Sequence, residues 1–122
     1  MPRQVLDETR LHPAIRDRIA NLNADIVHNV QAAASSNPVL VVGMGMNPFV
    51  RRARAALTAA GISYHYLGYG SYLSEWRRRN ALKMWSGWPT FPMVFVKGSL
   101  VGGANELGKL IASGELKRLL VE

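Results

Sequence analysis

Apolar side chains recur at helical spacing between residues 14 and 34. They are three or four positions apart, with charged and amide side chains between them: Ile15, Ile19, Leu22, Ile26 and Val30. This spacing predicts one amphipathic helix over residues 14–34. Pro13 supplies the fixed backbone torsion of a first helical turn, and the polar stretch at 35–38 ends the helix.

The next two elements follow from a change in this pattern. Residues 39–43 read VLVVG, a short β-branched run that is apolar on both faces, which predicts a buried strand with a parallel neighbour. After a loop at 44–46, Asn47 followed by Pro48 is typical of a helix start, because asparagine caps free N–H groups and proline suits the first turn. We expect this helix to run to Gly61.

The rest of the chain completes an α/β order with no internal repeat. The further elements predicted are a strand at 62–67, a helix at 72–84, strands at 93–96 and 99–101 joined by a turn at Lys97 and Gly98, and helices at 105–111 and 115–120. Gly102 and Gly103 lead into the first of these last two helices. The order predicts a sheet covered by helices.

Length and composition limit the classes of protein that fit. The chain has 122 residues, 48% of them hydrophobic, which suits a single domain over residues 1–122, with residues 1–13 expected to form a flexible N-terminal arm.

The chain contains no cysteine, so disulfides, thiolate metal sites and a cysteine nucleophile are excluded. The three histidines are scattered without ligand spacing, and we expect no metal site. No apolar run is long enough for a membrane span or a signal peptide, which predicts a cytoplasmic protein.

Positive charge is concentrated in the middle of the chain. The sequence has 15 Lys and Arg against 8 Asp and Glu, a formal net charge of +7. The bases between Met46 and Met84, where Glu75 is the one acid, are Arg51, Arg52, Arg54, Arg77, Arg78, Arg79 and Lys83. This stretch predicts a basic face that could attract nucleic acid, an acidic protein or a small carboxylate ligand, or that simply keeps the surface solvated.

Three motifs in the second half resemble a known family. They are WPTFP at 88–92, FVKG at 95–98 and LVGG at 100–103, and together they are similar to the C-terminal half of glutaredoxins, most of all the monothiol branch. NPVLV at 37–41 and SGEL at 113–116 also resemble that family. The resemblance implies a thioredoxin-like fold, with a central four-stranded mixed sheet flanked by helices and an extra N-terminal helix.

The resemblance also shows what this chain lacks. In glutaredoxins the nucleophilic cysteine begins the helix after the first strand, and here Asn47 and Val50 occupy the two cysteine positions while Pro48 and Phe49 remain. An asparagine caps a helix but cannot attack a disulfide, because the thiolate is the nucleophile in that exchange. We therefore assign no catalytic residue.

The parts of the family's glutathione cradle do have matches in the sequence. The resemblance places Phe91 and a cis-Pro92 against the backbone of the tripeptide, and puts its γ-glutamyl carboxylate at the start of the last helix motif, where Asn105 replaces the usual aspartate. Basic residues near the signature tryptophan match those that hold the glycine carboxylate. The implied ligand-binding residues are Asn47, Phe49, Arg79, Lys83, Thr90, Phe91, Pro92, Gly103, Ala104 and Asn105.

Three functions remain open at this point. The first, which we favour, is a non-catalytic module that binds glutathione or an extended peptide, with glutathione the one candidate cofactor. The second is a divergent member of a glutathione-dependent redox or electron-transfer family. The third is a basic adaptor for an acidic protein or nucleic acid, although the lack of aromatic residues interleaved with the arginines disfavours nucleic acid.

Overall fold

The computed structural model describes residues 2–122 and has a four-stranded mixed sheet at its centre. The strands are β1 (Val39–Gly43), β2 (His65–Gly68), β3 (Met93–Val96) and β4 (Ser99–Gly102), in the order β2-β1-β3-β4. β1 pairs with β2 in parallel and with β3 antiparallel, and β3 and β4 form the hairpin predicted from the turn at Lys97 and Gly98. The thioredoxin-like fold expected from the sequence is confirmed.

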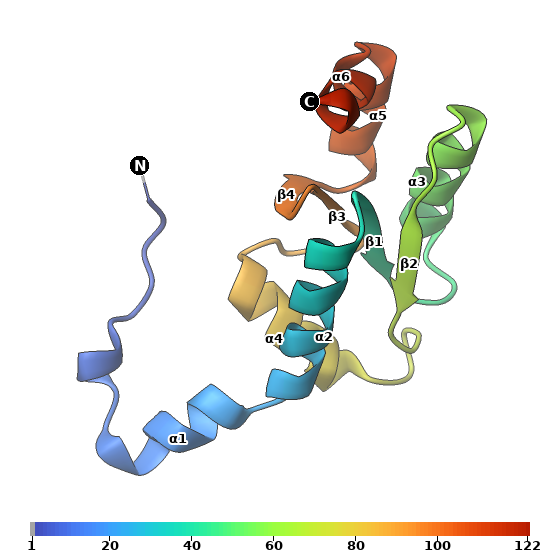
Figure 1. Ribbon diagram of the computed structural model, residues 1–122. Helices are drawn as coiled ribbons and strands as arrows, with labels where there is room; N and C mark the ends of the chain where they lie inside the picture. The colour runs from blue at the N-terminus through green and yellow to red at the C-terminus, as the bar shows by residue number, and fades with distance from the viewer. Residues whose placement is uncertain (1) are drawn as a thin grey trace.

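The described residues form six helices, and all of them except α1 cover the two faces of this sheet (Figure 1). They are α1 (Pro13–Asn21), α2 (Ala24–Ser36), α3 (Pro48–Ala59), α4 (Trp76–Ser86), α5 (Ala104–Ala112) and α6 (Glu115–Val121), with a short 3-10 turn at Glu8–Arg10. α2 and α4 lie on one face, and α3, α5 and α6 lie on the other. No helix within residues 2–122 combines the length and the apolar composition needed to cross a membrane.

The central strand β1 contributes to the core on both sides. Leu40 and Val42 pack into the cluster under α2 and α4, while Val39 and Val41 pack into the cluster under α3, α5 and α6. All five residues of β1 are buried, as the unbroken apolar run predicted. Because successive side chains of a strand point to opposite faces, one short strand ties the two helical layers together.

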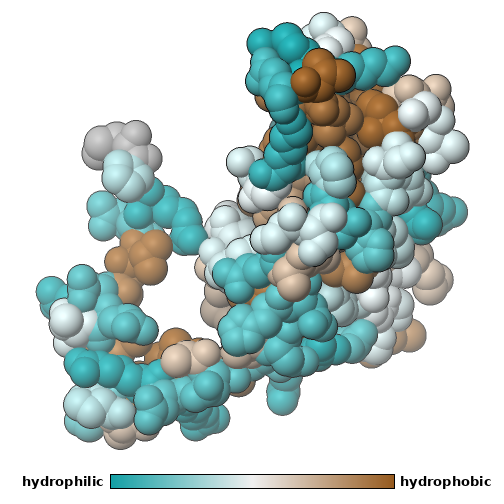
Figure 2. All heavy atoms as spheres, viewed as in Figure 1, coloured by the Kyte–Doolittle hydropathy of each residue, from teal (hydrophilic) through white to brown (hydrophobic). Residues whose placement is uncertain are grey.

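The single helix predicted over 14–34 is wrong, since the chain breaks between α1 and α2. Leu22 is extended, and Asn23 has a left-handed backbone with φ of 52°. The apolar stripe continues through the break, but Ile15, Ile19 and Leu22 are 42–54% exposed and α1 has no buried residue. In Figure 2 a gap separates much of the N-terminal segment from the body of the molecule, which the Arg3 side chain reaches by a hydrogen bond of 3.2 Å to the Trp85 carbonyl. Because no residue of α1 is buried, core packing does not hold the stripe in one straight helix.

Two further boundaries differ from those predicted. The strand expected at 62–67 narrows to β2, and the helix expected from residue 72 begins only at Trp76. Hydrogen bonds from the Ser71 and Leu73 N–H groups to nearby serine hydroxyls hold a turn before α4, and Leu73 is 95% exposed. Serine side chains often compete with helical hydrogen bonds in this way.

The arginines do not form the single basic face predicted for residues 46–84. Those of α3 and those of α4 lie on helices that cover opposite faces of the sheet. Within α4, Arg78 pairs with Asp25 at 2.8 Å and with Glu75 at 2.6 Å, and Arg79 is buried. Residues 46–84 do contain more basic than acidic residues, but the chain passes through β2 between α3 and α4 and so places their arginines on opposite faces of the sheet.

Candidate functional site

The N-terminus of α3 is closed by the side chain of Asn47. Its Oδ1 accepts hydrogen bonds from the N–H groups of Phe49, at 2.9 Å, and Val50, at 3.2 Å. Asn47 is only 8% exposed, and Pro48 occupies the first turn, as the sequence predicted. The position matched to the family's nucleophile therefore holds an amide that is already committed to the helix.

The chain reaches this cap through a tight approach between β1 and α3. A Cβ atom at Gly43 would lie 2.7 Å from a methyl group of Val50, so only glycine fits at the end of the strand. The loop that follows is fixed by a hydrogen bond of 2.7 Å from the Gly45 N–H to the Gly70 carbonyl. Met44 is buried there, while Met46 is 77% exposed.

The segment before β3 faces the start of α3. The Phe91–Pro92 peptide bond is cis, and Phe91 is buried with 6% exposure. A pocket of about 170 Å³ lies between this segment, α3 and α5. It is lined by Phe49, Trp88, Thr90, Phe91, Pro92, Gly103, Ala104, Asn105 and Glu106. Seven of the ten residues implied as ligand-binding thus lie in one pocket, which we call the cis-proline cleft.

The N-terminus of α5 forms the far end of the cis-proline cleft. Glu106 accepts a hydrogen bond of 2.9 Å from the Gly103 N–H through its Oε1, and the Asn105 side-chain oxygen accepts one from the Arg52 guanidinium. The first N–H groups of a helix have no partner within the helix, which leaves Ala104 and Asn105 with donors at this end. The arrangement is suited to an anionic group.

Sequence reasoning missed two polar residues at this end, Arg52 and Glu106. Glu106 could have been found from its spacing, because a glutamate three residues after the helix cap commonly reaches back to the cap N–H. Arg52 has no such signal: its partner Asn105 is 53 positions away in the chain. The Arg52 guanidinium also lies over the Phe49 ring, 5.2 Å from its centroid.

The two basic residues predicted to bind a carboxylate have different environments. Lys83 lies beside the cleft, with its Nζ 5.7 Å from the centroid of the Phe91 ring. Arg79 is 6% exposed and donates hydrogen bonds to the carbonyl groups of Tyr69, at 2.9 Å, and Ser74. Arg79 therefore holds the loop before α4 rather than lining the cleft.

Tyr69 supports that loop from inside the core. It is 8% exposed, and burial raises the pKa of its phenol above the usual value, with the nearby Arg78 cation acting in the opposite direction. The phenol therefore stays neutral at physiological pH. Its role in this structure is to pack beneath the loop that Arg79 holds.

One polar atom of the cleft has no partner within residues 2–122. The indole Nε1 of Trp88 is buried and forms no hydrogen bond. It would lie 3.5 Å from a Cβ atom placed on Gly103, and the Pro92 carbonyl would lie 3.3 Å from the same atom. A side chain at position 103 would therefore fill the space that these two groups border.

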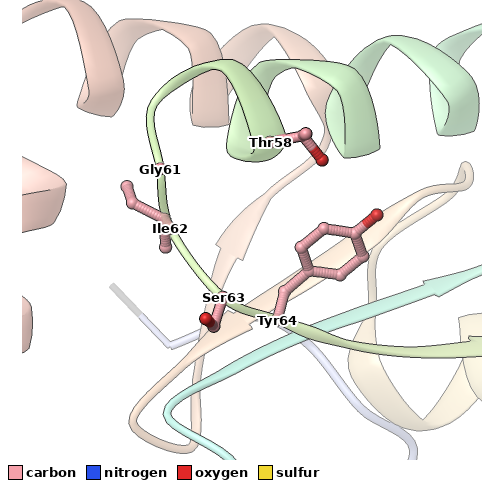
Figure 3. A pocket seen from close by; sticks show the side chains of 5 residues that line it. All are labelled: Thr58, Gly61, Ile62, Ser63 and Tyr64. Atoms are coloured by element: carbon pink, nitrogen blue, oxygen red, sulfur yellow. The ribbon is translucent and has the colours of Figure 1, made fainter.

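A larger pocket, of about 370 Å³, lies at the opposite end of α3. Figure 3 shows it between the helix end and the start of β2, with the side chains of Thr58 and Tyr64 turned toward the same space. Its remaining lining residues are Gly61, Ile62 and Ser63, and none carries a charge. It lies at the C-terminal end of the helix, away from the motifs identified in the sequence, and is a less suitable candidate site than the cis-proline cleft.

Comparison with known families and proteins agrees with the fold and the motifs. The family model of glutaredoxin matches residues 39–101. A glutaredoxin-like protein of Dictyostelium discoideum is 40% identical over 102 residues, which cover 84% of this chain and 83% of that protein. Monothiol glutaredoxin-S11 of Oryza sativa subsp. japonica is 37% identical over 98 residues, 76% of this chain and 19% of that much longer protein.

Solved structures give the same result. The oxidized glutaredoxin 2 of Chlamydomonas reinhardtii superposes with a TM-score of 0.70 and 25% identity, covering 81% of this chain and 94% of that one. A buckwheat glutaredoxin solved as its glutathione complex has a TM-score of 0.69 and 22% identity, covering 82% of this chain and 91% of that one. At that identity the second match concerns the fold.

Proposed function

This chain belongs to the glutaredoxin family, and from that premise we propose that it is a cysteine-free member that binds glutathione, or an extended peptide of similar shape, without thiol chemistry. The single observation that carries the proposal is Asn47, which caps α3 with an amide at the position matched to the nucleophile. Disulfide exchange needs a protein thiolate, and the sequence contains no cysteine.

Support for binding comes from the cis-proline cleft. The main chain at Phe91 can pair with an extended ligand in the manner of an added strand, and the start of α5 offers N–H groups to a carboxylate. Lys83 adds a positive charge beside the Phe91 ring. Members of this family bind glutathione, as the buckwheat complex illustrates.

The alternative of a basic adaptor has less support, because the sheet separates the arginines of α3 from those of α4. The alternative of a divergent redox protein is tested by activity. Purified protein should reduce hydroxyethyl disulfide with glutathione no faster than the uncatalysed rate, and turnover above that rate would favour the redox alternative.

The binding proposal is tested by titrating glutathione while following amide chemical shifts. We expect shifts at Phe91, Ala104 and Asn105 in the millimolar range and none at Ser63, which lies at the other end of α3. Flat shifts at the cleft residues up to tens of millimolar glutathione would refute the proposal.

Two glycines of one segment give a matched pair of variants. Gly103→Ala places a methyl group between Trp88 and the Pro92 carbonyl, inside the cleft, and should weaken binding. Gly108→Ala adds the same methyl group on α5 where nothing lies within 4 Å, so binding should not change. Equal effects of the two substitutions would place the ligand elsewhere.

A further inference from the structure

We propose that Arg52 makes the α5 end of the cis-proline cleft select a carboxylate that has no ammonium group beside it. The proposal rests on the function proposed above and narrows its ligand class. It concerns Arg52, Asn105 and Glu106, whose side chains determine the charge and the hydrogen-bonding capacity of that end.

Two contacts hold Arg52 at the cleft. Its guanidinium donates a hydrogen bond to the Asn105 side-chain oxygen, and it lies over the Phe49 ring at 5.2 Å from the centroid. Both Phe49 and Asn105 line the cleft. The cation is thus positioned at the rim from two directions, although Arg52 itself remains exposed to solvent.

The remaining groups at this end are mainly donors. Ala104 and Asn105 offer helix N–H groups, and Trp88 offers a buried indole N–H that has no partner within residues 2–122. Among the side-chain acceptors, the Asn105 oxygen accepts from Arg52 and the Glu106 Oε1 accepts from the Gly103 N–H, which leaves the second Glu106 oxygen and the Pro92 carbonyl as further acceptors. Such a set offers more donors to the oxygens of a carboxylate than acceptors to an ammonium group.

The charges at the α5 end of the cleft also favour a carboxylate over an ammonium group. Arg52 is the cation at this end and Glu106 the acid, and the Glu106 carboxylate is directed back to the Gly103 N–H. An ammonium group next to the bound carboxylate would therefore meet the guanidinium and the positive end of the α5 dipole. Glutathione carries both groups on its γ-glutamyl end, whereas its desamino analogue, glutaryl-cysteinyl-glycine, keeps the carboxylate alone.

The test compares these two ligands by calorimetry or chemical-shift titration, both kept reduced. The unmodified protein should bind the desamino analogue roughly fivefold more tightly, the size of one unit-charge interaction at about 4 Å in water. Arg52→Leu and Arg52→Gln should both remove most of this preference, since glutamine retains a donor for Asn105 but no charge. Arg51→Leu removes the same charge one residue away, outside the residues that line the cleft, and should keep the preference.

The outcomes separate this proposal from the one it rests on. If both ligands bind at the cleft with equal affinity, or if Arg51→Leu abolishes the preference as fully as Arg52→Leu does, the role of Arg52 is refuted while binding in the cleft stands. If neither ligand shifts the cleft residues, the proposed function fails, and the selectivity fails with it. Tighter binding of glutathione than of the desamino analogue would also overturn the inference.

Discussion

Residue 47 shows how one side chain can preserve a helix while removing its chemistry. The start of a helix needs an acceptor for its free N–H groups, and it also lowers the pKa of a thiol placed there. Asn47 meets the first need through two hydrogen bonds and cannot meet the second. The loss of thiol chemistry therefore entails no loss of local structure, and the two properties can be measured separately at this position.

The contribution of the cap can be tested with Asn47→Ala. This substitution leaves the Phe49 and Val50 N–H groups without their acceptor and should lower the free energy of unfolding by about 1 kcal/mol. Asn47→Asp keeps the acceptor and adds a negative charge at the positive end of the helix dipole, while burial opposes that charge, so this variant should be more stable than Asn47→Ala. Urea denaturation at neutral pH measures both, and an alanine variant as stable as the aspartate variant would contradict the role of the cap.

The electrostatic character of the same position can be tested with Asn47→Cys. The α3 N-terminus and the nearby Arg51 and Arg52 should lower the pKa of the new thiol below the ~8.5 of free cysteine, while burial at this position acts against ionisation. We expect the helix and the cations to dominate. Thiolate absorbance against pH measures the pKa.

The control for this measurement is Thr58→Cys, near the opposite end of α3. Thr58 is exposed, and the negative end of the helix dipole lies close to it, so its thiol should not show a lowered pKa. If the two thiols ionise at the same pH, position 47 does not have the environment of a helix N-terminus.

At the scale of elements, the strands were easier to predict than the helix boundaries. The VLVVG run at 39–43 specifies a buried strand because its position in the centre of the sheet requires apolar residues on both faces. The breaks before α2 and α4 occur at Asn23 and Glu75, which both have positive φ without being glycine. Such a conformation is imposed by the surrounding chain, so local sequence does not reveal it.

In the candidate site, too, local sequence does not reveal the features that depend on the surrounding fold. The resemblance of the proline and glycine motifs to those of glutaredoxins identified most of the cleft, whereas the roles of Arg52 and Arg79 depend on partners brought by the fold. The family resemblance implied Arg79 as a ligand-binding residue from its position before the signature tryptophan, but its side chain is buried against two carbonyl groups. Charge patterns in a sequence do not distinguish a surface arginine from a structural one.

Arg79 should therefore matter for stability more than for binding. Arg79→Met leaves the Tyr69 and Ser74 carbonyl groups without their donor and should lower the free energy of unfolding by roughly 2–4 kcal/mol, as expected for lost hydrogen bonds from a buried charge. Arg77→Met is the matched control on the same helix, since Arg77 is exposed and lies over the Trp76 ring; it should cost less than about 1 kcal/mol. Urea denaturation compares the two, and equal losses would contradict the structural role of Arg79.

At the scale of the whole molecule, the central sheet separates the basic residues that give the chain its net charge of +7. α3 and α4 cover opposite faces, and the partners of Arg78 and Arg79 leave fewer charges available on α4 than its sequence contains. Lys83 and Arg52 both lie against residues of the cis-proline cleft, but a long polyanion that lies along α3 does not also lie along α4. The net charge therefore overstates the affinity that any one surface can have for nucleic acid.

This distribution predicts a shallow salt dependence for any binding to double-stranded DNA. If α3 alone makes the contact, its three arginines, Arg51, Arg52 and Arg54, can neutralise three phosphates, and the slope of log K against log salt concentration should be about −2.7 at most. Fluorescence anisotropy with a labelled duplex across a range of salt concentrations measures this slope. Arg51→Ala should reduce its magnitude by about 0.9, because one phosphate contact is lost. Binding with a slope steeper than about −5 would require more phosphate contacts than α3 can supply, and would mean that cations outside α3, such as Lys109 on α5 or Lys117 on α6, also reach the duplex.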